Sequence, residues 1–458
     1  LTAMSLGTYE DVMSYSSAPA ANGHACVVNT SGDVKCLGIN TYGQLGRGDT
    51  TTFGTTSTEV GVNLSAVNLG DESSAVQVAV AENFSCALLL TGEVKCWGKN
   101  DYGQLGIGNT NSIGDGTGEM GNNLTAVPFS STIKVQSLGA GGINTCATLT
   151  NGTVKCWGQN SSGQLGQGNT TDVGSTTSSM LSLNHIRLRQ ERSRAIYSGM
   201  GHTCAILEDH KIQCWGKNDN GQLGLGDTTN RGDNSNEMGQ NLPYVDLGSG
   251  AQVMQLALGS NHTCALLETG VVKCWGDNGT KQLGDGSTAS YQLTPVQVTG
   301  LTSGVTAITA GLYHTCALLS SGAVNCWGNN GSGQLGDGST TARTAPVQVT
   351  GLTSGVTAIS AGENHTCALL ATGAVKCWGN NLQGRLGDGS TTDRLTPTQV
   401  SGLDSGVTAI TTGDFHTCAL LATGAVKCWG TGTYGKIGDG TSTSRTTPTQ
   451  VSGLDNGV

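Results

Sequence analysis

The sequence predicts an all-β protein, a β-propeller built from eight repeats. A short hairpin pattern recurs eight times, and the segments between hairpins are brief β-like runs separated by Gly-rich turns. Glycine accounts for 72 of the 458 residues and aromatic residues for only 4%. Such a chain favours short strands joined by tight turns over a large aromatic core. Four short antiparallel strands per repeat, repeated around a ring, are typical of a propeller, here with seven or eight blades.

The repeated hairpin is clearest at residues 365–379, where two alternating apolar runs flank a Thr-Gly turn. This pattern predicts a β-hairpin with glycine in the left-handed position. Counting outward from the turn, Val375 falls opposite Leu369. Two residues further out, Cys377 falls opposite Cys367. Opposed residues on paired strands have Cβ atoms about 4.5–5.5 Å apart, which a small adjustment brings to disulfide geometry.

The same Cys-x9-Cys spacing uses every cysteine in the chain. Eight pairs with no cysteine left over predict eight local disulfides, one in each hairpin. The predicted pairs are Cys26 with Cys36, Cys86 with Cys96, Cys146 with Cys156, Cys204 with Cys214, Cys264 with Cys274, Cys316 with Cys326, Cys367 with Cys377 and Cys418 with Cys428.

The repeats divide into a long and a short kind. Successive first cysteines are 60, 60, 58, 60, 52, 51 and 51 residues apart. Because stacked repeats share one continuous core, we expect a single propeller domain over residues 1–458. Its long repeats cover about 1–250 and its short repeats about 251–458. The extra residues of the long repeats follow the Gly-Gln-Leu-Gly motif, so we expect polar loops on one half of one rim.

Composition and charge exclude some classes of partner and indicate the cellular compartment. The net charge of −10 argues against a nucleic-acid partner bound through its phosphates. No run of 18 apolar residues occurs, so membrane insertion is not expected. Paired cysteines in every repeat indicate an oxidising compartment, that is, an extracellular or cell-surface location. The chain begins at Leu1 without a visible signal peptide, so we expect a mature or trimmed product or part of a longer protein.

The repeats resemble those of the regulator-of-chromosome-condensation propellers. The matching pieces of one unit are His314-Thr315-x-Ala317-Leu318, Gly322-x-Val324-x-x-Trp327-Gly328 and Gly333-Gln334-Leu335-Gly336. All eight repeats carry versions of these pieces, so the resemblance covers nearly the whole chain. It implies a closed ring, usually of seven blades. This chain departs from the family in having eight hairpins, a disulfide in each, and no basic tail.

Members of this family have three known kinds of activity, and the resemblance implies them for this chain to different degrees. The best-known relative is a nuclear nucleotide-exchange factor that touches chromatin, but disulfides would not persist in a reducing nucleus. Some plant relatives sense ultraviolet light through extra tryptophans, whereas all seven tryptophans here stand in the repeated Cys-Trp-Gly. Secreted bacterial relatives act as protein-binding propellers and are the nearer analogy.

Two kinds of segment do not fit the repeat. Leu181–Ser193 is the only basic cluster, and we expect an insertion or a reading-frame error there that fits the repeat geometry poorly. Leu1–Gly7 and the segment from Pro448 both read as fourth strands, which gives nine such strands for eight hairpins. An unpaired strand is a template for another chain. We therefore expect Leu1–Gly7 or Pro448–Val458 to contact another protomer or its own continuation.

Recurrent polar residues suggest structure rather than catalysis. A His-x-Cys motif tempts a metal interpretation, but six similar sites around a ring cannot converge on one metal. Aspartates in Gly-Asp-Gly turns are expected to bond local N–H groups rather than act as acid–base pairs. The histidines are His24, His202, His262, His314, His365 and His416, and the aspartates are Asp285, Asp337, Asp388 and Asp439.

No cofactor and no catalytic site are expected. The Asp- and Asn-rich insert 227–239 offers oxygen ligands for Ca²⁺ but lacks the spacing of a dedicated calcium loop. No Ser/His/Asp set, phosphate loop or nucleophilic cysteine stands out. Asn-x-Ser/Thr motifs are candidate glycosylation sites. They lie at Asn29, Asn63, Asn83, Asn123, Asn151, Asn160, Asn169, Asn261, Asn278, Asn330 and Asn364.

Two functions remain for a secreted, non-enzymatic propeller. The first is a structural, self-assembling component of an extracellular or cell-surface structure such as a filament, whose partner is the protein itself. This hypothesis rests on the surplus strand, the dense disulfides and the glycosylation motifs. The second is an extracellular binding module for a protein or carbohydrate, by analogy with secreted relatives.

Overall fold

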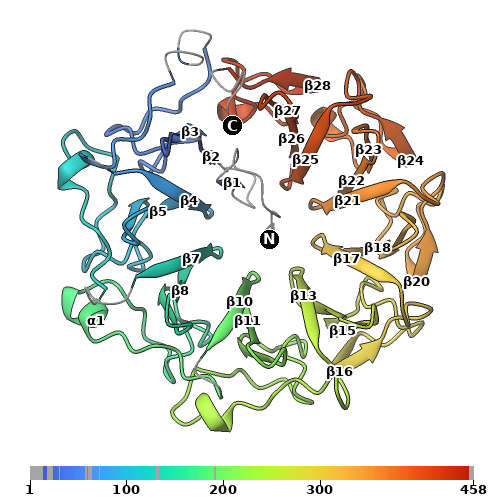
Figure 1. The fold of residues 1–458 in the computed structure, drawn as a ribbon, viewed down its shortest axis with the longest axis horizontal. Coiled ribbons are helices and arrows are strands. Elements are labelled where there is room, and N and C mark those ends of the chain that lie inside the picture. Colours follow the sequence, from blue (N-terminus) through green and yellow to red (C-terminus); the bar gives the residue numbers. More distant parts are fainter. Residues whose placement is uncertain are drawn as a thin grey trace.

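Eight sheets stand around a central axis in the computed structural model (Figure 1). The structure describes residues 14–17, 24–29, 31–56, 59, 64–71, 73–129, 134–189 and 192–452. Within these residues each of the eight predicted hairpins lies in a sheet of its own. The expected all-β propeller is therefore confirmed, and the described residues give eight sheets, numbered here in chain order.

The first four sheets contain three strands each and the last four contain four. The strands of the first four are β1 (Ser14–Ser17), β2 (His24–Val28), β3 (Val34–Gly38), β4 (Ala75–Val80), β5 (Phe84–Leu89), β6 (Val94–Gly98), β7 (Val135–Ala140), β8 (Asn144–Leu149), β9 (Val154–Gly158), β10 (Ser193–Ser198), β11 (His202–Leu207) and β12 (Ile212–Gly216). Those of the last four are β13 (Val253–Leu258), β14 (His262–Leu267), β15 (Val272–Asp277), β16 (Tyr291–Gln297), β17 (Val305–Ala310), β18 (His314–Leu319), β19 (Val324–Gly328), β20 (Arg343–Gln348), β21 (Val356–Ala361), β22 (His365–Leu370), β23 (Val375–Gly379), β24 (Arg394–Gln399), β25 (Val407–Thr412), β26 (His416–Leu421), β27 (Val426–Gly430) and β28 (Arg445–Gln450). The short helices are α1 (Thr177–Leu181), η2 (Gly121–Asn123), η3 (Gly239–Asn241), η4 (Leu382–Gly384) and η5 (Thr433–Gly435).

The hairpins, each with its two strands joined by a disulfide (a stapled hairpin), have the expected register. Leu369 pairs with Val375, and Cys367 pairs with Cys377. All sixteen cysteines lie in the described residues and form disulfides within their own hairpins, with Cα–Cα distances of 4.0–4.2 Å. These distances are slightly shorter than the roughly 4.5 Å of a non-hydrogen-bonded opposed pair, the closer of the two kinds in an antiparallel sheet.

The disulfides are the eight that the spacing predicts, and no described cysteine is free. In the first four sheets they join Cys26 to Cys36, Cys86 to Cys96, Cys146 to Cys156 and Cys204 to Cys214. In the last four sheets they join Cys264 to Cys274, Cys316 to Cys326, Cys367 to Cys377 and Cys418 to Cys428.

The four-stranded repeat holds only for the last four sheets. In each of the first four, the long insertion interrupts the outer position. Among the described residues only isolated bridges to the third strand remain, one each in the first, third and fourth sheets and two in the second. In the second sheet, for example, Gly98 bridges Ile113, and the Val127 N–H then donates to the Val94 carbonyl at 2.8 Å. The larger loops of these sheets extend outward along half of the ring in Figure 1, as the repeat lengths predict.

The segment Leu181–Ser193 fits the repeat geometry, so the expectation of a poor fit is wrong. The Ile186 N–H donates to the Val154 carbonyl at 2.7 Å. One repeat later, the Val245 N–H makes the same bond to Ile212 at 3.1 Å. Ile186 and the residues beside it therefore occupy the outer position of the third sheet, whereas Ser193 begins β10 of the fourth.

The side chains of that segment also have specific partners. Ile186 and Leu188 are buried, which reproduces the two-residue apolar spacing of Val245 and Leu247. Arg189 donates from Nη2 and Nε to the carbonyls of Gln240 and Leu242, at 2.7 and 3.1 Å. These contacts are those of a genuine variant of the repeat, not of a misread sequence.

The candidate fourth strands at the two ends have different outcomes. Pro448 lies in β28, which pairs with β27 of its own sheet, and the Val451 N–H donates to the Val426 carbonyl at 2.9 Å. The C-terminal segment up to Ser452 is thus used within the ring. Leu1–Gly7 and the residues after Ser452 lie outside the described residues.

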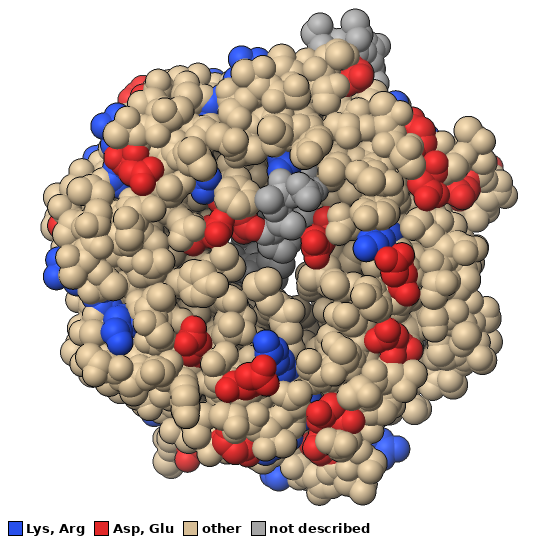
Figure 2. Space-filling view, turned by 180° about the vertical axis from the view of Figure 1, so that it is seen from behind, with Lys and Arg blue, Asp and Glu red and all other residues tan. Residues whose placement is uncertain are grey.

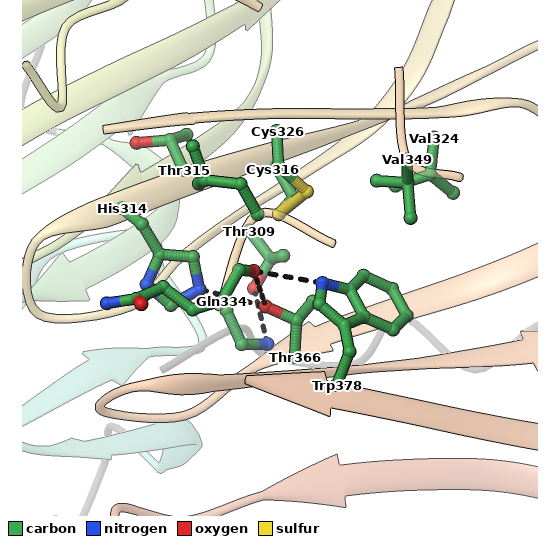
Figure 3. The surroundings of a disulfide bond; sticks show 12 residues. Thr309, His314, Thr315, Cys316, Val324, Cys326, Gln334, Val349, Thr366 and Trp378 are labelled. Carbon is green, nitrogen blue, oxygen red and sulfur yellow. Dashed lines mark hydrogen bonds between the residues drawn. A yellow bond between two sulfur atoms is a disulfide. The ribbon is translucent and has the colours of Figure 1, made fainter. Parts of the chain in front are cut away.

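Hydrogen bonds join neighbouring sheets at recurring positions, as Figure 3 shows for the sixth and seventh sheets. The Gln334 carbonyl accepts from Trp378 Nε1 at 2.9 Å and from Thr366 Oγ1 at 3.0 Å. The same hydroxyl lies 2.9 Å from His314 Nε2. All seven tryptophans are fully buried, and six of them make this bond to the preceding sheet.

Candidate functional site

The recurrent histidines lie inside the junctions between sheets. His202, His262 and His314 are buried, and the Nε2 of each lies 2.9–3.1 Å from a threonine hydroxyl of the next sheet. Burial lowers the pKa of His202 and His314 to about 4. A neutral imidazole that bonds a hydroxyl is a structural group, as the spacing of these residues around the ring predicts.

The aspartates of the Gly-Asp-Gly turns bond local groups. Asp388 Oδ1 accepts from the Ser390 N–H at 2.9 Å, and its Oδ2 pairs with Arg394 Nε at 2.6 Å. Although burial raises the pKa of Asp388, the hydrogen bonds from Arg394 and Ser390 leave it lowered. Asp337 and Asp439 pair with arginines in the same way. The turn interpretation is confirmed, and the arginine six residues later was the partner that sequence reasoning missed.

The acidic insert 227–239 uses its carboxylates within the loop. Asp227 pairs with Arg231 at 2.6 Å. Glu237 accepts from the N–H groups of Gly232 and Asn234 at 2.9 and 3.0 Å. Among the described residues, no three His, Cys, Asp or Glu side chains gather as metal ligands do. The carboxylates of Asp227 and Glu237 therefore already accept hydrogen bonds within the loop.

The glycosylation motifs differ in accessibility. Asn160, Asn278 and Asn330 are fully buried, and their amides donate to carbonyls of the following loop, so these three asparagines cannot carry a glycan in this fold. Asn123, Asn151 and Asn169 are exposed, and glycosylation at these positions stays a prediction. Asn63 lies outside the described residues.

One loop of the repeat has a glutamine with a fixed structural role. In the first six sheets, the Gln of Gly-Gln-Leu-Gly or Lys-Gln-Leu-Gly accepts through Oε1 from the N–H two residues earlier, at 2.8–2.9 Å. In the sixth sheet this bond joins Gln334 to the Ser332 N–H. The glutamine thereby sets the path of the loop between the third and fourth strands.

The last two sheets replace this glutamine by a cation. Arg385 and Lys436 have no acceptor in their side chains, so neither can make the glutamine's bond. Arg385 instead donates from Nε to the Leu382 carbonyl at 3.1 Å. Gln383 and Tyr434 stand two residues before Arg385 and Lys436, so their N–H groups lack the glutamine acceptor. Both residues have a φ of 63°. Non-glycine residues at positive φ are uncommon and often mark functional sites.

These two loops turn apolar side chains outward. Leu382 is 62% exposed and Tyr434 is 44% exposed. In the other sheets the position of Leu382 holds a small or polar residue, such as Gly331. Loops after the third strand and turns after the first strand lie at the same edge of an antiparallel sheet. The acidic turn residues Glu363 and Asp414 therefore share this edge with Leu382 and Tyr434.

The acidic and basic groups interact across the two sheets. Arg385 Nη1 donates to the Asp414 backbone carbonyl at 3.3 Å, and its guanidinium lies 4.9 Å from the centre of the Phe415 ring. Burial raises the pKa of Asp414 to about 7, an effect to which Glu363 adds. Burial lowers the pKa of Lys436 to about 8. We call Glu363, Leu382, Arg385, Asp414, Tyr434 and Lys436 the two-sheet cluster.

On the face drawn in Figure 2, charged side chains lie in small separate groups on a mostly uncharged surface, with acidic groups beside the central opening. No helix among the described residues is long and apolar enough to cross a membrane. Sequence reasoning missed the cluster, although Gly-Arg-Leu-Gly and Gly-Lys-Ile-Gly in place of Gly-Gln-Leu-Gly were a readable signal.

Comparison with known proteins identifies the family. The sequence model of the RCC1-like domain matches residues 174–458, and that of the Regulator of chromosome condensation (RCC1) repeat matches residues 75–104 and 135–164. The chain belongs to the RCC1-like family. Among RCC1-like proteins, the ultraviolet-B receptor UVR8 of Arabidopsis thaliana is 32% identical over 373 residues, 80% of this chain and 79% of the receptor. Human E3 ubiquitin-protein ligase HERC2 is 29% identical over 84% of this chain but only 8% of its own length.

Solved structures show the same RCC1-like fold. Human WBSCR16 superposes with a TM-score of 0.62 at 20% identity, over 84% of this chain and 98% of its own. Yeast RCC1 (Prp20), solved bound to Kap60, gives a TM-score of 0.56 at 21% identity, over 92% of this chain and 83% of its own.

Proposed function

We propose that this RCC1-like propeller is a protein-binding module of an extracellular compartment, and that it binds through the two-sheet cluster. The replacement of glutamine by Arg385 and Lys436 carries the proposal, because it is tied to the two left-handed loops that expose Leu382 and Tyr434. Exposed apolar side chains beside a partly buried charged group are the usual composition of an interface centre.

The chemistry of the cluster favours a partner with an apolar side chain next to a lysine or arginine. Leu382 and Tyr434 supply apolar contact. Asp414 and Glu363 supply carboxylates, and a cation brought against Asp414 would hold it ionised. The net charge of −10 would also speed the approach of a basic partner.

Relatives support a protein partner in general terms. A solved structure shows Kap60 bound to yeast RCC1, and another study of Prp20p concerns its binding to Gsp1p and histones. We do not carry those partners over, because eight disulfides and the acidic charge suit a different compartment. A carbohydrate ligand is the alternative, and we propose no catalytic role.

A displayed library of random peptides tests the proposal. We expect wild-type protein to enrich sequences in which a large apolar residue adjoins Lys or Arg. The double variant Leu382→Ser/Tyr434→Ser should lose at least about tenfold in affinity for them, since apolar anchors dominate such interfaces. The matched control Tyr102→Ser, at the position of Tyr434 in the second sheet, should bind normally. Enrichment that survives the double variant would contradict the assigned surface.

The pH dependence of the same binding gives a second readout. Asp414 with a pKa of about 7 is mostly protonated at pH 6 and mostly ionised at pH 8. Affinity for a basic peptide should therefore rise over this range in the wild type, and Asp414→Asn should flatten the rise. A steep rise in the variant would assign the titration to another group.

Self-assembly through an unpaired strand edge was the first function expected from the sequence. One of the two segments that could supply such an edge is now accounted for. Pro448–Gln450 is paired within its own sheet, and Leu1–Gly7 lies outside the described residues. Deleting Leu1–Gly7 and measuring particle size tests the remaining candidate. Unchanged size would remove the strand-edge hypothesis and leave the binding module in its place.

A further inference from the structure

The ring closes between its first and eighth sheets without exchanging a strand. The described strands of the first sheet come from residues 14–38, and those of the eighth come from residues 407–450. Each sheet is one continuous stretch of chain. The first and eighth sheets therefore meet through loop and side-chain packing, and no described strand from one of them completes the other.

Four hydrogen bonds recur at the other junctions. A glycine N–H bonds a carbonyl of the next sheet at seven junctions, as Gly389 does to Thr446 at 2.8 Å. A serine or threonine hydroxyl bonds the carbonyl of the loop glutamine, or of Arg385, at the same seven. A tryptophan indole donates to that carbonyl at six, and a histidine bonds the hydroxyl at five.

None of these four bonds joins the described residues of the eighth and first sheets. Ala25 stands where the other sheets have Ser or Thr, and Leu37 stands where they have Trp. The buried Nε2 of His416, which would face that hydroxyl, has no hydrogen-bond partner. The Gly440 N–H also lacks the bond to Gly54 that the repeat would predict.

Apolar side chains fill the junction instead. Leu37 and Val28 of the first sheet share one buried cluster with Val426, Ile437 and Val451 of the eighth. A void of about 20 Å³ remains between them, lined in part by Leu37, Ile437 and Val451. Among the described residues, the junction is thus an apolar contact without the four recurring hydrogen bonds. Its composition resembles the apolar core of an interface between subunits.

We propose that the junction of the first and eighth sheets opens, and that each exposed face then pairs with the matching face of a second copy of this chain. The occupant follows from the surfaces themselves. The eighth sheet is already complementary to a first sheet, and a second copy presents an identical one. The contact is head to tail, so two open rings can close into a dimer, and further copies can extend into a chain. This goes beyond the proposed ligand-binding function and uses a different surface.

Hydrogen exchange of the native protein tests the opening. Backbone amides of β2–β3 and β25–β27 should exchange at least about tenfold faster than those of β14–β15 and β18–β19, because their junction lacks the recurring bonds. The double variant Ala25→Thr/Leu37→Trp, which restores the repeat residues, should remove the difference. Uniform exchange in the wild type would overturn the proposal.

Particle size tests the second copy. The full chain is held in mild denaturant, returned to buffer and sized by light scattering over about a hundredfold range of concentration. We expect dimers and longer species from the wild type and from a Leu1–Gly7 deletion, and monomers from Ala25→Thr/Leu37→Trp. A monomeric wild type, or oligomers that the double variant keeps, would refute the proposal. Loss of oligomers on deleting Leu1–Gly7 would refute it in favour of a strand edge.

Two further variants complete the test, one as a replacement if the double variant does not fold and one as its converse. If the double variant does not fold, Ala25→Thr by itself supplies the hydroxyl that His416 lacks and should still reduce the oligomers. Ser85→Ala/Trp97→Leu removes the corresponding hydroxyl and indole from the junction between the first and second sheets, and so reproduces the weak junction there. It should speed exchange there and increase the oligomers, and an unchanged exchange rate would count against the role assigned to these two residues.

Discussion

At the scale of single residues, buried histidines make the propeller sensitive to acid. His314 is fully buried, its Nε2 lies 2.9 Å from the Thr366 hydroxyl, and burial lowers its pKa to about 4. The unfolded chain takes up this proton below about pH 6.5, whereas the folded chain does so only near pH 4. The contribution to stability is therefore fully present above pH 6.5 and is lost as the pH falls toward 4.

We expect the free energy of unfolding to fall steeply between pH 7.5 and pH 5. His314 should account for about 2 kcal/mol of the loss at pH 5, from the difference between its two pKa values. Guanidinium unfolding of wild type and His314→Asn, with disulfides intact, measures this. Asparagine fits because Asn144 occupies the same position in the third sheet. An equal loss in the variant would show that another group titrates.

Residue identities also limit what the sequence could predict. The disulfides were predictable because a spacing of ten residues and a two-residue alternation fix opposed positions on a hairpin. The Arg394–Asp388 pair and the two-sheet cluster were not, because both depend on how a loop or a neighbouring sheet folds back. A single departure from the repeat, such as Arg385 for Gln, becomes interpretable only after the role of glutamine is known.

At the scale of elements, the stapled hairpin is the unit of stability. Every disulfide spans a separation of 10 residues, so each removes a similar loop entropy from the unfolded chain. The Cys316–Cys326 bond is buried beside the hydrogen bonds of the next junction (Figure 3). The hairpins should therefore contribute similarly, whichever sheet contains them.

Replacing Cys316 and Cys326 together by Ala should lower the free energy of unfolding by about 3 kcal/mol, the loop-closure value for this length. The same change at Cys86 and Cys96 should cost about as much. Denaturant unfolding under non-reducing conditions measures both. A negligible cost at one site would show that packing around that hairpin, rather than loop length, decides the contribution.

Elements also show where pattern matching fails. Leu181–Ser193 lacks the sequence motif of the repeat but keeps its burial pattern, because Ile186 and Leu188 supply the same apolar spacing. Arg189 is accommodated because three backbone or amide groups bond it from the fourth sheet. The opposite holds for the long repeats, which matched the pattern while their insertions left only bridges in place of a fourth strand.

At the scale of the whole molecule, each sheet is contiguous in the chain. A circular permutant that joins Val458 to Leu1 by a flexible linker and opens at Gly250, between the fourth and fifth sheets, should keep all eight sheets. We expect its melting temperature to stay within about 4 °C of the wild type. A control permutant opened at Gly270, inside the β14–β15 hairpin, should melt lower. Similar losses in both would argue against independent sheets.

The short span of the disulfides has a consequence for biosynthesis. Sixteen cysteines could be joined in a very large number of wrong ways, yet each correct partner is the next cysteine along the chain. Closing a loop of about ten residues takes roughly 10–100 ns, far less than the time needed to add a residue at the ribosome. Disulfide formation itself takes seconds or longer, depending on the oxidant, and synthesis of one repeat also takes seconds at about 5–20 residues per second. With an efficient oxidant, a hairpin that enters an oxidising lumen can therefore oxidise before the next cysteine pair arrives. Order of synthesis then selects the native pairing, and little is left for a disulfide isomerase to correct.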